Sequence, residues 1–249
     1  MRCRNLYLCL YCRYRFVFTL MFFILLVPLL LLVSESSLAG NKPPFVDPKL
    51  TSGEKTTYKV LEDGKVFETS HTIFREKYNG KDVYVVKTDT YHMILHASDL
   101  RPILIKKMNS NCEVELSIEY TDDRVHFIYP GPKRNKVEKI PEDRYDLHTI
   151  VEVVRGYPFG KKKVKFTLVT PEHIVDAYMK TEKDEKITVP AGTFDCYKLK
   201  GGISGLIGKV FGKDFFFWVE KTHPYRIIKQ TDSNQERTME LVSCEIVEN

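Results

Sequence analysis

Cys196 is the residue of this chain that first suggests covalent chemistry, and it lies in the segment ITVPAGTFDCYKL at residues 187–199. A nucleophilic thiol needs a base within hydrogen-bond reach. The neighbouring Asp195 does not qualify, because adjacent residues of a strand point to opposite faces. The segment is better interpreted as a hairpin corner, where Pro190 presets φ and Gly192 supplies a flexible position two residues later. A distant histidine acting on Cys196 stays open.

Histidine and carboxylate pairs are the next candidates. His92 and His96 are four residues apart, but TYHMILHAS reads as a strand, in which four residues span about 13 Å. That separation is too large for one shared metal ion. Asp146 and His148 are interpreted as a capping residue and a surface polar residue rather than as a catalytic pair. Since the chain also has no GxSxG elbow and no phosphate-binding glycine motif, we predict no enzyme activity, no metal site and no cofactor.

The first 39 residues are of a different kind from the rest. They begin with four arginines and no acid, continue with the apolar run at residues 16–33, and end in Ser37-Leu38-Ala39. This order predicts a signal peptide cleaved before Gly40. The apolar run also approaches the roughly 17–20 residues that span a bilayer, so an uncleaved N-terminal hydrophobic helix that contacts the membrane is the alternative. Either way we expect export, to the periplasm or to an inner-membrane anchor facing the periplasm.

The exported part is nearly balanced in charge. Of 38 basic and 33 acidic residues in the chain, four arginines and one glutamate belong to the leader, which leaves 34 and 32. This balance gives no support to nucleic-acid binding. Three of the six cysteines, Cys112, Cys196 and Cys244, follow the leader. In an oxidising compartment two of them can pair, with Cys196–Cys244 preferred, or all three can be buried thiols.

The exported part has the alternation of β-strands. Residues 40–50 are proline-rich and predict a linker, and after them apolar and polar residues alternate, most cleanly in CEVELSIEY at 112–120. Asp63-Gly64 and Asn79-Gly80 are hairpin dipeptides. Strands recur about every 8–12 residues, which predicts one mainly β domain at residues 51–249. We expect a large curved antiparallel sheet, a half-barrel or open barrel, with no βαβ crossover.

One segment departs from the strand pattern. PEDRYDLHTIVEVVRGYPF places Tyr145, Leu147, Ile150 and Val154 near helical spacing, with acids before them and a glycine after them. The spacing predicts a helix over Tyr145–Arg155 whose apolar side packs across the sheet.

Several segments resemble a known family. SGEKTTYKVLEDGKVFETSHTIF, DLHTIVEVVRGYPF, ITVPAGTFDCYKLKG and FFFWVEKTHPYRIIKQ are similar to domain-of-unknown-function family 3108 of exported bacterial proteins. Asp146 and Arg155 match positions of that family's central helix. The family implies no established activity. More distantly, the chain resembles the LolA and LolB lipoprotein carriers, which implies a curved sheet around a hydrophobic cavity that holds acyl chains.

Apolar residues near the C-terminus are the candidates for ligand contact. Leu206, Ile207 and Phe211 lie in the glycine-rich stretch GGISGLIGKVFGK, which suits a loop at the mouth of a pocket. Phe216 and Trp218 belong to FFFW, a strand that is apolar on both faces. Packing under the helix is the alternative explanation for these aromatic residues.

Three functions are therefore open. The first is a non-enzymatic envelope protein that binds a lipid or another apolar molecule in the concave face of its sheet. The second is a membrane-tethered scaffold without a ligand. The third is a hydrolase that uses Cys196 or a carboxylate.

Overall fold

The computed structural model describes residues 42–131, 135–205 and 212–248. These residues belong to one compact unit, Gly40–Asn249. The predicted signal peptide or anchor lies outside the described residues. Within the described residues, no helix has both the length and the apolar character that crossing a membrane requires.

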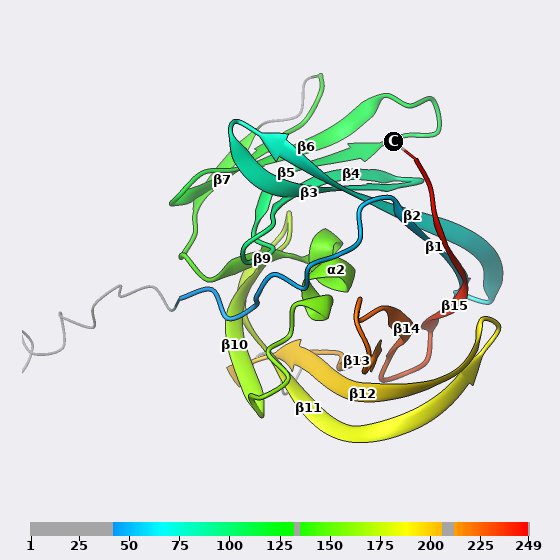
Figure 1. Cartoon of the computed structure of the whole chain (residues 1–249). Coiled ribbons are helices and arrows are strands. Elements are labelled where there is room, and N and C mark those ends of the chain that lie inside the picture. The colour runs from blue at the N-terminus through cyan, green and yellow to red at the C-terminus, as the bar shows by residue number, and fades with distance from the viewer. Residues whose placement is uncertain (1–41, 132–134, 206–211, 249) are drawn as a thin grey trace, which may run out of the picture. The chain divides into compact units, whose positions relative to one another are not determined.

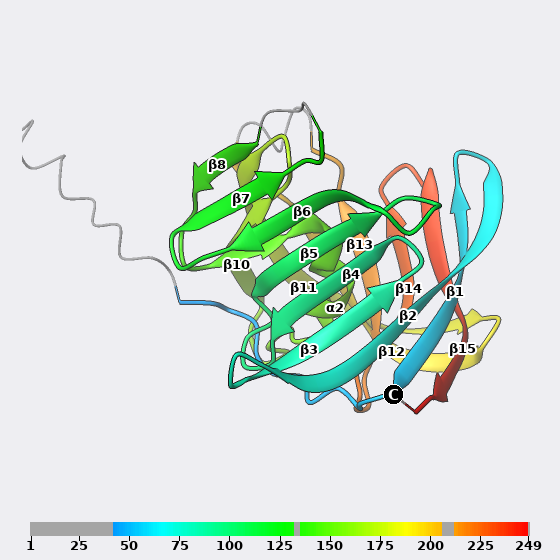
Figure 2. The same ribbon diagram turned by 90° about the horizontal axis from the view of Figure 1, so that it is seen from above.

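The described residues form one curved sheet of fifteen strands (Figures 1 and 2). Strands that follow one another along the chain are neighbours in the sheet, except β8 and β9, which form its two edges, and the first and last strands, β1 and β15, also pair. The order is β8-β7-β6-β5-β4-β3-β2-β1-β15-β14-β13-β12-β11-β10-β9. The strands are β1 (Glu54–Glu62), β2 (Lys65–Tyr78), β3 (Lys81–Thr88), β4 (Tyr91–His96), β5 (Pro102–Met108), β6 (Val114–Tyr120), β7 (Arg124–Ile128), β8 (Lys136–Lys139), β9 (Arg144–Asp146), β10 (Lys163–Val169), β11 (Ile174–Val189), β12 (Gly192–Ile203), β13 (Phe215–Glu220), β14 (Ile227–Asp232) and β15 (Arg237–Ile246). The predicted mainly β architecture with a large curved sheet is confirmed.

Local sequence explains the hairpins. Asp63-Gly64 and Asn79-Gly80 connect β1–β2 and β2–β3, and all four residues have positive φ, as tight hairpin turns require. The corner at residues 190–192 joins the long strands β11 and β12, so its interpretation as a turn is confirmed. In β6, Leu116, Ile118 and Tyr120 are buried while Ser117 and Glu119 are more exposed, as the alternation predicts. At the start of the pattern the prediction fails, because Cys112 and Val114 are exposed.

The segment predicted as one long helix is shorter and more varied than expected. Tyr145 lies in β9, a 3₁₀ turn η1 covers Leu147–Thr149, and the α-helix α2 spans only Ile150–Arg155. The predicted helix start was wrong because β9 pairs with β10 and Asp146 is extended, so its carboxylate can accept the backbone N–H of His148. The strands β9 and β10 pair in parallel, and α2 follows β9 and precedes β10 along the chain. The three elements form a βαβ crossover, so the expectation of no crossover was also wrong.

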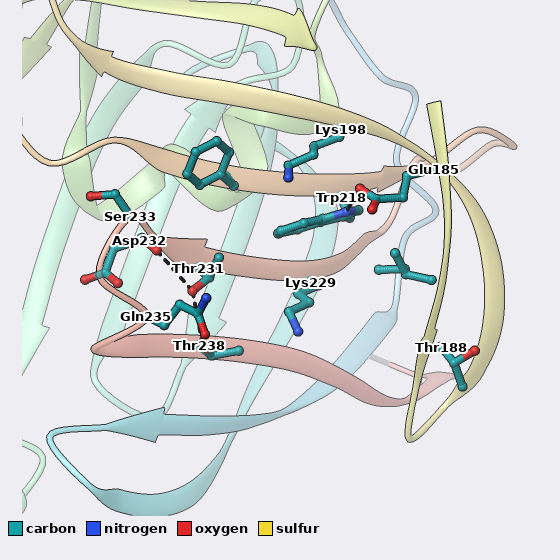
Figure 3. Close-up of a pocket in the computed structure, with 12 residues that line it drawn as sticks. Glu185, Thr188, Lys198, Trp218, Lys229, Thr231, Asp232, Ser233, Gln235 and Thr238 are labelled. Carbon is teal, nitrogen blue, oxygen red and sulfur yellow. Dashed lines mark hydrogen bonds between the residues drawn. The ribbon is translucent and has the colours of Figure 1, made fainter. Parts of the chain in front are cut away.

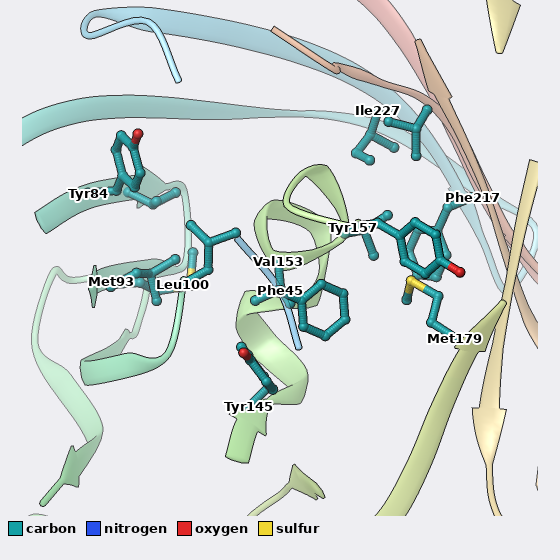
Figure 4. Packing of buried hydrophobic residues seen from close by; sticks show 14 of the residues in the cluster. Phe45, Tyr84, Met93, Leu100, Tyr145, Val153, Tyr157, Met179, Phe217 and Ile227 are labelled. Carbon is teal, nitrogen blue, oxygen red and sulfur yellow. The ribbon is translucent and has the colours of Figure 1, made fainter. Parts of the chain in front are cut away.

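The helix α2 lies inside the curve of the sheet (Figure 1). Val153 and Val154 are fully buried there, together with aromatic and aliphatic side chains from both halves of the sheet. Figure 4 shows Phe45, Tyr145, Tyr157 and Phe217 around the helix. These side chains belong to one hydrophobic cluster, so the concave face is a packed core.

Residues 42–50, where the sequence predicts a linker, have no helix or strand but contact the core. Phe45 is buried, with its ring edge-on to Tyr145 at 4.9 Å and to Phe166 at 5.3 Å between centroids. The backbone N–H of Val46 donates to the carbonyl of Gly156. This segment therefore covers the C-terminal end of α2.

Candidate functional site

A pocket of about 520 Å³ lies between the β11–β12 hairpin and the face of β13–β15 that points away from the core. The hairpin bends across these strands, and the N–H of Ala191 in its turn donates to the carbonyl of Leu241 on β15. Figure 3 shows side chains from both sides projecting into the space between them. The pocket is lined by Glu185, Ile187, Thr188, Lys198, Phe216, Trp218, Lys229, Thr231, Asp232, Ser233, Gln235 and Thr238.

Strand alternation explains how the aromatic run FFFW supplies both the core and the pocket. Phe217 points into the core and is 2% exposed. Its neighbours Phe216 and Trp218 point to the opposite face, where they line the pocket. The sequence predicted a strand that is apolar on both faces, and the structure confirms it.

Pairing across three strands places two lysines beside the indole. Lys198 on β12 is opposite Trp218 on β13, which is opposite Lys229 on β14. The Nζ atoms lie 4.7 Å (Lys198) and 5.9 Å (Lys229) from the centre of the Trp218 ring. Each ammonium interacts favourably with the ring, so this arrangement combines an apolar surface with positive charge.

Glu185 fixes the orientation of the indole from the hairpin side. Trp218 Nε1 donates to Glu185 Oε2 at 2.9 Å. This hydrogen bond, with the ammonium of Lys183 3.3 Å from the other carboxylate oxygen, holds the pKa of Glu185 below its ordinary value. Glu185 is therefore an anion at neutral pH, and Trp218 is held by its one polar atom.

Hydroxyl and amide groups form the remaining wall of the pocket. The hydroxyls of Thr231 and Thr238 lie 3.1 Å apart, and the carboxylate of Asp232 accepts the backbone N–H of Glu236. Ser233 and Gln235, on the turn between β14 and β15, are exposed at the rim. The pocket thus offers several hydrogen-bond donors and acceptors around one aromatic surface.

The predicted ligand residues divide into two groups. Phe216 and Trp218 lie together in the pocket, and ligand contact at these two residues remains a prediction. Leu206, Ile207 and Phe211 lie outside the described residues. Lys198, Lys229 and Glu185 cannot be recognised as pocket residues from the sequence, since the register that brings them to Trp218 is set by contacts between strands.

Cys196 has the environment of a structural thiol. It is fully buried on β12, and burial, followed by the charges of Glu220 and Asp195, raises its pKa to about 12. A thiol with this pKa is protonated at neutral pH and is a poor nucleophile.

Cys112, Cys196 and Cys244 are free thiols, so the predicted Cys196–Cys244 disulfide is not formed. The two residues lie on β12 and β15, with β13 and β14 between them.

Asp146 and His148 form a pair beside the core. Asp146 Oδ1 accepts the backbone N–H of His148 and lies 2.7 Å from its Nδ1, while Oδ2 accepts the hydroxyl of Tyr120. The predicted capping role of Asp146 is confirmed, because its carboxylate accepts the backbone N–H of His148 at the start of η1. The same carboxylate, which is fully buried, also orients the imidazole of His148. Among the described residues, no group of three histidine, cysteine or acidic side chains is arranged to hold a metal ion.

The family model of a protein of unknown function, DUF3108, matches residues 50–242. The chain belongs to the DUF3108 family. The DUF3108 region contains α2 and all twelve residues of the pocket. The family resemblance stated from the sequence is confirmed. Comparison with the curated proteins finds no match.

Several solved structures are similar to this chain at low sequence identity. A β-barrel-like protein of domain of unknown function DUF1849 from Brucella abortus is 10% identical, with a TM-score of 0.50 over 80% of this chain and 100% of that chain. The hypothetical lipoprotein YmcC of Escherichia coli is 7% identical, with a TM-score of 0.32 over 77% and 85% of the two chains. The lipoprotein LppX of Mycobacterium tuberculosis is 8% identical, with a TM-score of 0.23 over 77% and 84%. At this similarity the DUF1849 structure supports only the fold of this DUF3108 protein and carries no information about its function.

Proposed function

We propose that the protein is an exported, non-enzymatic envelope protein that binds a small ligand with at least one apolar face. The observation that carries this proposal is the pocket in which Phe216 and Trp218 form an aromatic surface between Lys198 and Lys229. A concave site that combines aromatic side chains with a few fixed polar groups is typical of ligand binding.

The binding site is placed in this pocket rather than in the concave face of the sheet. The concave face holds α2 and a continuous cluster of buried side chains, including Val153, Tyr145 and Phe217. A lipid there would have to displace α2 from its packing against these residues. We therefore retain the proposal of a ligand with an apolar part, but we propose that this part contacts Phe216 and Trp218 in the pocket instead of the concave face of the sheet.

Export and the lack of catalysis rest on separate observations. The arginine-rich, apolar leader supports export to the envelope. The high pKa of Cys196 disfavours thiol catalysis at neutral pH. The oriented imidazole of His148 contacts Asp146 and Tyr91, neither of which is a serine or cysteine nucleophile.

Trp218 is the only tryptophan of the chain, so its fluorescence reports on the pocket directly. Protein prepared from the envelope without detergent is expected to carry a bound compound, detected by native mass spectrometry. Removal of the compound should shift the emission of Trp218, and its return should reverse the shift. A protein that carries no compound, and whose emission is unchanged by extraction, contradicts the proposal.

A membrane-tethered scaffold is the second candidate, and the packed concave face favours it because no lipid cavity is needed there. Its test is the state of the leader. Retention in membranes after an alkaline wash, with residues 1–39 still attached, supports the tether. A released product that begins at Gly40 contradicts it.

A further inference from the structure

We infer that the ligand of this pocket is an acidic saccharide, meaning a sugar that carries a carboxylate or phosphate group. This inference rests on the proposed function and specifies its ligand. It follows from three features of the pocket, which are its polar lining, its single flat apolar surface and one lysine without an ion-pair partner.

The lining excludes a purely apolar ligand. Nine of the twelve lining residues are polar or charged, and only Ile187, Phe216 and Trp218 are apolar. An acyl chain that filled this space would remove water from hydroxyl, amide and carboxylate groups without replacing their hydrogen bonds. Each such loss costs about 1–3 kcal/mol in proteins, so a chain of methylene groups fits the pocket poorly.

A sugar ring matches the same groups. One face of a pyranose presents C–H groups, which pack on an indole ring, and its edge presents hydroxyls, which need both donors and acceptors. The half-buried Phe216 and Trp218, which is 8% exposed, together supply the apolar surface, and Trp218 Nε1 donates to Glu185, which holds the ring in place. Thr231, Gln235 and Thr238 lie across the pocket from Trp218, where their hydroxyl and amide groups can bond the sugar hydroxyls (Figure 3).

The charge of the ligand follows from a comparison of three lysines on this face. Lys229 Nζ lies 2.7 Å from Oε1 of Glu240, and Lys200 Nζ lies 2.6 Å from Oδ2 of Asp214. Lys198 contacts the rings of Phe216 and Trp218, and among the described residues it forms no ion pair with a carboxylate. Its charge acts on Glu185, but the carboxylate of Glu185 is bonded to Trp218 and Lys183. Lys198 is a half-buried residue that lines the pocket. An anionic group on the sugar would supply the missing partner.

The test is a titration of the full exported protein with two trisaccharides of similar size, followed by Trp218 fluorescence and calorimetry. Trigalacturonic acid carries carboxylates, and maltotriose is neutral. We expect the acidic trisaccharide to bind at least about tenfold more tightly, because a hydrogen bond to a charged group contributes more than one to a neutral group. Equal binding of the two trisaccharides would overturn the inference.

Matched variants test the role of Lys198. Lys198→Met is expected to weaken binding of trigalacturonic acid about tenfold, since it removes the unpaired ammonium. Lys200→Met is the control, because Lys200 is on the same face of β12 but is paired with Asp214 and does not line the pocket. Equal effects of the two substitutions would overturn the inference.

Sodium oleate separates this inference from the proposed function. If oleate changes the emission of Trp218 and neither trisaccharide does, the pocket binds a ligand but the saccharide inference is wrong. If none of the three compounds binds, the saccharide inference is wrong. The proposed function then fails as well if the envelope preparation carries no bound compound.

Discussion

Arg155 on α2 donates two hydrogen bonds to the carboxylate of Glu54 on β1, from Nη1 to Oε1 at 2.7 Å and from Nη2 to Oε2 at 3.0 Å. Both side chains are almost completely buried. Nη2 also donates to the carbonyl of Pro224, in the loop between β13 and β14. One guanidinium therefore joins the helix to both halves of the sheet and holds α2 in the concave face.

Loss of this ion pair should destabilise the fold strongly. Glu54→Gln leaves the charge of Arg155 buried without its partner, and breaking such a pair typically costs about 3–5 kcal/mol. Chemical denaturation followed by circular dichroism measures the change. Lys55→Met is the control, because Lys55 forms an exposed ion pair with Glu245, and such pairs contribute less than about 1 kcal/mol. Similar losses in the two variants would show that Glu54 does not hold α2.

Gly156 is required where the N-terminal segment crosses the end of α2. A Cβ at this position would lie 2.4 Å from the carbonyl oxygen of Val46 and 2.6 Å from Cδ1 of Leu100. Gly156→Ala should therefore cost about 1–3 kcal/mol, because the backbone at Val46 has to move. Gly160→Ala is the control, since a Cβ there meets no atom within 4 Å. An unchanged melting temperature for Gly156→Ala would show that residues 42–50 are free to shift.

The cysteines should differ in reactivity. Cys112 is exposed, whereas Cys196 is buried with its pKa raised to about 12. At neutral pH a thiol reagent such as iodoacetamide is expected to modify Cys112 in the folded protein and Cys196 only after unfolding. Peptide mass spectrometry after short labelling times distinguishes the two sites. Rapid modification of native Cys196 would restore the thiol hydrolase as a candidate.

Alkaline pH should unfold the protein through its buried tyrosines. Burial is the main cause that raises the pKa of Tyr58, Tyr120 and Tyr145 above the ordinary value. A raised pKa in the folded state means that the stability from these groups is complete below about pH 10 and falls as pH rises further. Absorbance at 295 nm should therefore show these tyrosines ionising together with the loss of structure. Ionisation of every tyrosine near pH 10 in a folded protein would contradict their burial.

The sequence predicts the sheet well because its signals are local. Alternation and the pairs Asp63-Gly64 and Asn79-Gly80 specify strands and turns from adjacent residues, and the structure confirms them. The end of the helix at Gly156 is also predicted. The start of the helix is not predicted, because Tyr145 lies in β9. That strand is specified by its pairing with β10, more than twenty residues later in the chain, and not by the residues next to Tyr145.

The pocket depends on register, which the sequence does not reveal. Phe216 and Trp218 are recognisable as candidates because the FFFW run is apolar on both faces. Lys198 and Lys229 are about thirty residues apart, and only the pairing of β12, β13 and β14 places them on either side of one indole. The bend of the β11–β12 hairpin, which closes the pocket, is likewise fixed by tertiary contacts such as that between Ala191 and Leu241.

The central claim is that ligands bind on the outer face at Trp218 and not inside the sheet around α2. The most direct test is a ¹⁵N–¹H correlation spectrum, because a chain with one tryptophan gives one indole N–H signal. Addition of trigalacturonic acid is predicted to shift that signal and the amides of β13 and β14, while the amides of Val153 and Val154 stay in place. Shifts at Val153 and Val154 with an unchanged indole signal, on addition of trigalacturonic acid or of oleate, would contradict it.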